Sequence, residues 1–152
     1  MALPDIFTEP VATAVIRRIE QLTPDSQPQW GKMNVAAMLA HCNVTYEMVY
    51  ENIHPQPGFF MKMILKNFIK KAVTSETPYK RNIPTASSFL IKDQRKFDIE
   101  KERLIRYILK TSQLGAAHFN QKESHSFGKL THEEWNNMFY KHLDHHLTQF
   151  GV

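Results

Sequence analysis

The sequence predicts an all-α fold, a four-helix bundle with a long crossover that carries an extra short helix. Apolar residues recur at helical spacing in every long segment, and none of these segments alternates with the period of a strand. Glycine is scarce, at five of 152 residues. With 42% hydrophobic residues the chain can bury one sizeable core but is too short for two. Residues 1–152 are therefore expected to form a single domain.

Two long helices are expected in the first third of the chain. The first covers residues 8–21 with Thr8 as its N-cap, and the second covers residues 34–53 with Asn34 as its N-cap. Prolines and glycines separate the two helices and end the second one. Each carries an apolar stripe for the core, formed by Val11, Val15, Ile19 and Leu22 in the first and by Val35, Met38, Leu39, Cys42, Tyr46, Val49 and Ile53 in the second.

Residues 54–92 have the length of a crossover between two core helices. Within them, residues 59–73 form a short amphipathic helix, and residues 74–92, which contain Pro78 and Pro84, are expected to be loop. The short helix is expected to pack outside the bundle as part of the connection.

The last two helices complete the bundle. One covers residues 93–112, with Gly115 just past its end as a stop signal. After a polar loop, Thr131 and Glu134 make a capping box for the final helix. The buried side of the final helix includes Trp135, Met138, Phe139, His142, His146 and Phe150.

The final helix also carries the residues that could bind a metal. His142 and His146 are four residues apart and therefore lie on the same side of the helix, one turn from each other. His41 is the best candidate for a third ligand. It lies about 10 Å from the start of its helix, and the midpoint of the pair lies about 9 Å from the end of the final helix. These levels match if the two helices are antiparallel, which the crossover at residues 54–92 permits.

An ordinary pair of half-buried histidines, bonded to water or carbonyl groups, is the alternative interpretation of His142 and His146. The chain has eight histidines, so a spacing of four also arises by chance. The apolar face that both residues share, the level of His41, and the nearby His145 and Gln149 favour a metal site.

The string His142-x-x-His145-His146-x-x-Gln149, together with the lone His41, resembles the DinB-like and YfiT-like superfamily of metal-dependent proteins. This resemblance implies an up-down-down-up four-helix bundle with a divalent metal at one end. An uncharacterised bacterial branch of the superfamily is similar in two further stretches, Phe127-Gly128-Lys129-Leu130-Thr131 before Trp135 and Met33-Asn34-Val35 before Leu39-Ala40-His41.

The resemblance also implies roles for single residues. His145 matches an extra histidine of the family and is expected at the edge of the site. Relatives often have Arg-Gly where this chain has Leu147-Thr148. The thiol-dependent maleylpyruvate isomerases have a carboxylate at the position of His142. The metal ligands that the resemblance implies in this chain are His41, His142 and His146.

A site of three neutral imidazoles predicts zinc or nickel as the divalent metal cofactor, with open positions for water or a thiolate. The natural activities are those of a hydrolase that activates water, or of a transferase that moves a low-molecular-weight thiol onto a small-molecule substrate. Gln149 is expected to orient a ligand or close the end of the bundle. Thr45 is expected to reach the rim of the site or to bond its own backbone. No general base can be named, because Asp144, Glu47 and Glu51 are interpreted as solvated or surface charges.

The rival hypothesis is a non-enzymatic binding or stress-associated protein that uses the basic face of the crossover helix. The formal net charge is +4, and Lys62, Lys66, Lys70 and Lys71 form a basic ridge. Nucleic acid is not expected as a partner, since basic and acidic residues are interspersed along the chain. No membrane span is expected, and Cys42 as the only cysteine indicates the cytoplasm. A homodimer that pairs through an exposed apolar helix face is expected.

Overall fold

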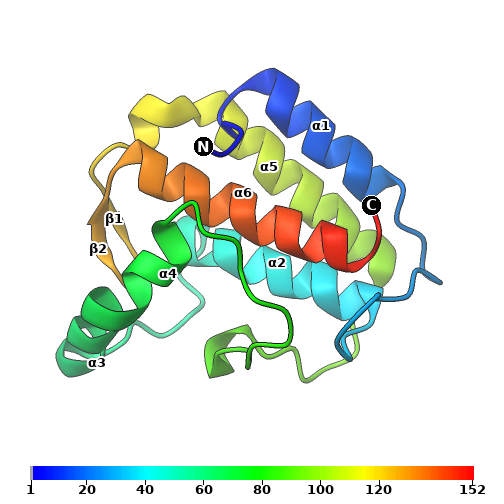
Figure 1. Ribbon diagram of the computed structural model, residues 1–152, viewed down its shortest axis with the longest axis horizontal. Helices are drawn as coiled ribbons and strands as arrows, with labels where there is room; N and C mark the ends of the chain where they lie inside the picture. The colour runs from blue at the N-terminus through cyan, green and yellow to red at the C-terminus, as the bar shows by residue number, and fades with distance from the viewer. Residues whose placement is uncertain (1) are drawn as a thin grey trace.

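The computed structural model describes residues 2–152, and its helices confirm the all-α class (Figure 1). The long helices are α1 (Glu9–Glu20), α2 (Val35–Tyr50), α5 (Phe97–Phe119) and α6 (His132–Gln149). The connection between α2 and α5 contains α3 (Phe59–Ile64), the π-helical segment η1 (Leu65–Ile69), α4 (Lys70–Thr74) and a 3-10 turn η2 (Ser87–Phe89). Among the described helices, none is both long and apolar enough to cross a membrane.

The helices α2 and α6 are antiparallel neighbours. Tyr46 of α2 stacks on Phe139 of α6, with ring centroids 5.0 Å apart. His41, more than one turn earlier in α2, meets His146, about two turns later in α6. The sequence predicts that His41 lies at the same height in the bundle as His142 and His146, and this prediction depends on α2 and α6 being antiparallel.

The helix α5 lies against α2 and is parallel to it. Asn43 donates a hydrogen bond to the carboxylate of Glu100 near the start of α5, and Tyr50, at the end of α2, shares a hydrogen bond of 2.7 Å with Thr111. Aromatic stacking of Tyr46 on Tyr107 fills the space between the two helices.

The helix α1 covers α5 and α6 and is parallel to α6. The Ile6 N–H, just before α1, donates to Asn136 Oδ1, and Arg18, at the other end of α1, forms an ion pair of 2.7 Å with Asp144. The core between α1, α2, α5 and α6 draws on side chains from Ile6 to Phe150.

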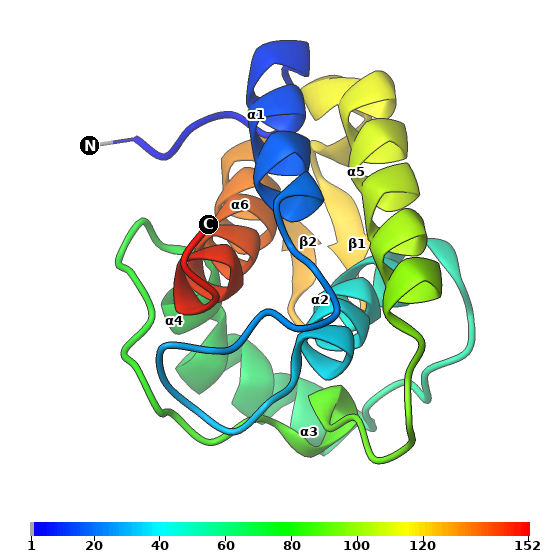
Figure 2. The same cartoon turned by 90° about the vertical axis from the view of Figure 1, so that its right-hand side faces the viewer.

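The crossover helix, which we define as residues 59–74, lies outside this core, below α2 and α6 in Figure 2. Its C-terminal end is fixed to α6 by polar contacts. Lys141 Nζ donates to the Ala72 and Ser75 carbonyls, and Asn137 Nδ2 donates to the Thr74 carbonyl at 2.9 Å. These bonds satisfy carbonyls that the end of a helix leaves without partners. Burial lowers the pKa of Lys141 to about 8.

Two local expectations from the sequence were wrong. Instead of a polar loop before α6, β1 (Lys122–Ser124) pairs antiparallel with β2 (Gly128–Leu130); strands of three residues are too short to show a period-two pattern. The fourth expected helix begins at Phe97, later than expected, and continues to Phe119. Gly115 has φ 72° and ψ 169°, so the regular helix stops at this glycine, as the sequence predicts, and a short helical segment follows the kink.

Glu47 is also not the surface charge that its position in the sequence indicated. Its carboxylate is hydrogen-bonded to His54, at 2.8 Å, and forms an ion pair with Arg103 of α5, and the residue is buried. Arg103 bonds Glu100 as well. The sequence held no signal for this cluster, because the arginine lies 56 residues away from Glu47 and only the packing of α5 on α2 joins them.

We predict that Thr131→Ala lowers the free energy of unfolding by about 1 kcal/mol. The Thr131 hydroxyl accepts the Glu134 N–H, and Glu134 Oε2 in turn accepts the Thr131 N–H at 3.0 Å, so the substitution removes the hydroxyl half of the capping box of α6. Urea unfolding measures the change. Thr8→Ala is the matched control and should change stability less, because the Thr8 hydroxyl bonds the Asp5 carbonyl and caps no N–H of α1.

Candidate metal centre

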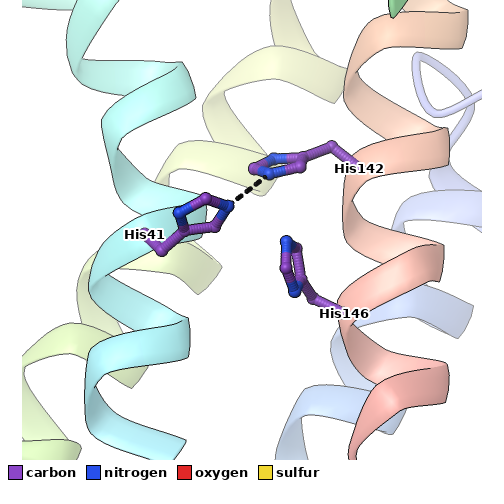
Figure 3. Close-up of side chains that lie close together, drawn as sticks. All are labelled: His41, His142 and His146. Atoms are coloured by element: carbon purple, nitrogen blue, oxygen red, sulfur yellow. Dashed lines mark hydrogen bonds between the residues drawn. The ribbon is translucent and has the colours of Figure 1, made fainter. Parts of the chain in front are cut away.

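Three histidines from two antiparallel helices meet at one point in the structure (Figure 3). His41 comes from α2, and His142 and His146 come from successive turns of α6. One ring nitrogen of each lies within 4.8 Å of the others. His41 and His146 are buried, and His142 keeps partial exposure because it lines a cavity. This is the one group of three or more histidine, cysteine or acidic residues with such spacing in residues 2–152.

Each of the three rings is oriented by an oxygen atom at its Nδ1. His41 Nδ1 lies 3.1 Å from the Phe89 carbonyl oxygen, and His142 Nδ1 lies 3.1 Å from the hydroxyl of Thr45. His146 Nδ1 lies 2.8 Å from Gln149 Oε1. The remaining nitrogen of every ring, Nε2, is therefore free to face the other two rings.

The partners fix which nitrogen carries the proton in two of the rings. A carbonyl oxygen only accepts, so His41 Nδ1–H donates to Phe89. The Gln149 amide donates through Nε2 to the Trp30 carbonyl, which leaves its Oε1 to accept from His146 Nδ1–H. In both neutral rings Nε2 then carries a lone pair, the form that binds a metal.

His142 is the ring whose tautomer can change. Its Nε2 lies 2.9 Å from His41 Nε2, so in the metal-free protein His142 Nε2–H donates to His41 and Thr45 donates to His142 Nδ1. A hydroxyl can also accept. If the proton moves to Nδ1, Thr45 becomes the acceptor and all three Nε2 atoms offer lone pairs to one point.

The spacing of the nitrogens suits a single ion. Two nitrogens bound tetrahedrally to zinc at 2.0–2.1 Å lie roughly 3.4 Å apart. The separation of 2.9 Å between His41 and His142, and the limit of 4.8 Å for the whole set, bracket this value. Small rotations of the side chains would bring the three nitrogens to bonding distance.

The electrostatic environment keeps the three rings neutral. Burial lowers the pKa of His146 to about 3, and it also lowers the pKa of His41. The pKa of His142 falls well below its ordinary value, first because of burial and then because of repulsion from the neighbouring histidines. Neutral imidazole is the protonation state that a metal requires.

Gln149 does both things that the sequence allowed for it. It orients His146, and through Trp30 it ties the end of α6 to the loop before α2. Gly31 lies so close that a Cβ there would come within 2.7 Å of Gln149 Nε2. The glycine also has φ +83°, a conformation that other residues rarely adopt.

The other expected residues lie around the cluster. Thr45 reaches His142 with its side chain, which was the less favoured of its two expected roles. His145 lies at the edge, where its ring packs against Trp30 and Tyr79 with centroids 5.9 and 5.7 Å away. Asp144 forms an ion pair with Arg18 and is not simply solvated.

Sequence reasoning missed the Phe89 carbonyl and a cavity beside the cluster. The carbonyl belongs to the backbone of an expected loop, so no residue type could indicate it. The cavity has a volume of about 610 Å³, and the three histidines line it together with apolar side chains of α2, α6 and the crossover helix. The apolar stripe of the crossover helix was visible in the sequence, but it does not distinguish a cavity wall from a packed face.

The comparisons with known proteins point to one family. The family model described as "Protein of unknown function (DUF1569)" matches residues 7–151. Neither the curated proteins nor the solved structures gave a match.

We predict that the free energy of unfolding of the metal-free protein falls as the pH is lowered from 7 to 4. The pKa of His146 is about 3 in the folded state, against about 6.5 in an unfolded chain. Between these values only the unfolded state takes up the proton, which costs about 1.4 kcal/mol of stability per pH unit for each such histidine. Urea unfolding across this range measures the slope. His146→Leu should flatten it, whereas the same change at exposed His118 should not; an unchanged slope in His146→Leu would contradict the prediction.

Proposed function

We propose that this chain, which belongs to the DUF1569 family of proteins of unknown function, is an enzyme that depends on a divalent metal. The metal would be held by His41, His142 and His146. Zinc or nickel is the proposed metal, because three imidazole nitrogens suit both ions. The proposed reaction is hydrolysis by an activated water or transfer of a small thiol.

The observation that carries this proposal is that the three Nδ1 atoms have protein oxygens as partners while the three Nε2 atoms converge. Histidines that bind metals are oriented in this way by a carbonyl, carboxylate or amide oxygen on their other nitrogen. The partners here are Phe89, Thr45 and Gln149.

When bound at such a site, a divalent ion acidifies a water molecule or binds a thiolate, and it polarises the substrate. The protein would contribute the orientation of the three rings, the switch of Thr45 from donor to acceptor, and a cavity in which the substrate lies beside them. In the described residues no carboxylate lines this cavity, so a general base from its walls would have to be a histidine outside the proposed ligands, such as His145.

Several expectations remain predictions under this proposal. We propose that residues 1–152 form a single domain, since the core draws on side chains from Ile6 to Phe150. Its placement in the DinB-like and YfiT-like superfamily as an up-down-down-up four-helix bundle, a cytoplasmic location and a homodimer also stay predictions.

A second candidate function is binding through the crossover helix. Phe59, Phe60 and Phe68 are exposed by 87%, 67% and 76%, and exposed Lys66 and Lys71 are interspersed with them. Exposed aromatic rings beside lysines are typical of helices that lie on an anionic membrane surface. α3 projects from the rest of the molecule (Figure 1), so this surface is open to a partner.

We predict that the purified wild-type protein binds one divalent ion per chain and that His41→Ala abolishes this binding. Loss of His41 leaves two ligands on one helix, which rarely suffice for a structural or catalytic site. Metal analysis after loading with zinc or nickel, with circular dichroism to verify folding, gives the result. His118→Ala, at an exposed histidine outside the cluster, is the control. A wild type that takes up no divalent metal under any loading condition would refute the proposed function.

We predict further that Thr45→Val weakens metal binding about 10–100-fold, because valine cannot accept the His142 Nδ1–H that the metal-bound tautomer requires. Valine fills nearly the same space, so the change tests the hydroxyl itself. Thr111→Val is the matched control: this buried threonine bonds Tyr50 and the Tyr107 carbonyl, away from the cluster. Equal affinities in the two variants would contradict the proposed role of Thr45.

For the second candidate, we predict that the wild type co-sediments with phosphatidylserine vesicles at low salt and less at high salt. Replacing Phe59, Phe60 and Phe68 by serine should abolish this. Serine at Leu109 and Leu114, which are exposed on α5, is the control. Vesicle binding that is absent, or equal in both variants, would eliminate this candidate and leave metal binding untouched.

A further inference from the structure

We infer that the cavity beside the histidine cluster binds a small molecule through an uncharged, apolar tail, with the reacting polar group of that molecule at His41, His142 and His146. This inference rests on the proposed metal site and adds the class of substrate that the site accepts. It depends on the composition of the cavity, its direction and the helix that closes it.

The cavity is large and mainly apolar. Its volume of about 610 Å³ lies in the range of pockets that enclose small-molecule ligands. Met48 and Val49 of α2 and Met138 of α6 form one side. Leu65 and Ile69 of η1 and Val73 of α4 form the opposite side. The cavity is partly open to solvent, so a ligand can reach it from outside.

No charged side chain lines the cavity. Its polar groups in the described part of the chain come from histidine, serine, threonine, tyrosine and the indole N–H of Trp135, without aspartate, glutamate, lysine or arginine. A charged group that left water for this cavity would lose its hydration and gain no counter-charge. The tail of the ligand must therefore be uncharged, and a small thiol that carries carboxylates or an ammonium group does not fit here.

The cavity extends along α6 away from the cluster. His146, His142, Met138 and Trp135 all line it, and from residue 146 to residue 135 the helix rises about 16 Å. The histidines thus lie at the end nearest the C-terminus of α6, and the lining beyond Met138 is uncharged, with Trp135 and Phe127 beside Ser124, His125 and Ser126 of the hairpin. A ligand whose polar group reaches the histidines extends its tail along this direction.

The crossover helix closes the cavity without filling it. Leu65, Ile69 and Val73 recur every four residues on the side that lines the cavity. The helix is held at its far end by Lys141, which bonds the Ala72 carbonyl, and by the Lys70–Glu134 ion pair of 2.8 Å. The apolar stripe of the crossover helix faces space that a hydrocarbon chain can occupy. In a helix with only a structural role, this stripe would pack directly against α2 and α6.

The test uses straight-chain alkyl hydroxamates, which carry one metal-binding group and a tail of chosen length. With the zinc-loaded wild type, we expect affinity to rise about fourfold for each added methylene until the cavity is full. A hydroxamate of matched length that ends in a carboxylate should bind far more weakly than its neutral counterpart. Affinity that does not depend on chain length, or equal binding of the two matched compounds, would overturn the inference.

Ile69→Glu is the diagnostic variant, because Ile69 lines the cavity yet is 43% exposed and should tolerate a charge. It should weaken binding of octanohydroxamate at least tenfold and leave that of acetohydroxamate unchanged. Leu109→Glu on α5 is the matched control, since Leu109 is also 43% exposed but lies outside the cavity. Equal loss of octanohydroxamate binding in both variants would refute the assigned location.

A neutral dye separates this inference from the proposed function. Metal-free wild type and Leu109→Glu should bind N-phenyl-1-naphthylamine, and Ile69→Glu should not. Dye binding without any zinc binding would refute the metal-dependent function and support the apolar cavity. Zinc and acetohydroxamate binding without dye binding would support the metal site and refute the cavity. Dye binding that persists in Ile69→Glu would place the dye elsewhere and overturn the inference.

Discussion

The site depends on the partners that the six ring nitrogens of His41, His142 and His146 find, two of these rings being buried and one partly exposed. Phe89, Thr45 and Gln149 supply an oxygen to each Nδ1. The three Nε2 atoms have only one another, and a single N–H between His41 and His142 is the one hydrogen bond among them. Buried lone pairs without partners cost free energy in a low-dielectric interior. A cation at the centre would relieve this cost, which supports the proposed affinity for a metal.

The rest of the fold brings together these partners, which come from distant parts of the chain. The Phe89 carbonyl comes from the end of the long crossover, and Gln149 is fixed by the Trp30 carbonyl in the loop before α2. Because the crossover helix is tied to α6 by its terminal carbonyls, its apolar stripe is kept away from α2. One long connection thus orients a ring of the metal site and also forms a wall of the adjoining cavity.

Helical periodicity and capping residues were sufficient to predict the long helices and the histidines that come together. The level of His41 could be calculated because helical rise is constant, and Asn34 and Thr131 mark helix starts through bonds within three residues. Features that depend on distant partners could not be predicted. The buried carboxylate of Glu47 is paired with Arg103, which reaches it from α5, and the short hairpin lacks a periodic signal.

The absence of charge links the metal site to the cavity. Three neutral imidazoles leave both positive charges of a bound divalent ion uncompensated, and no carboxylate in the described part of the cavity wall offsets them. Electrostatic attraction is strong where the dielectric constant is low, so the ion would favour a ligand with an anionic donor group. Beyond this first group the walls are mainly apolar and carry no charged side chain, so they penalise a second charge. The two conditions together select a molecule with one anionic or strongly polar end and a hydrocarbon body, which is the class of ligand that alkyl hydroxamates represent.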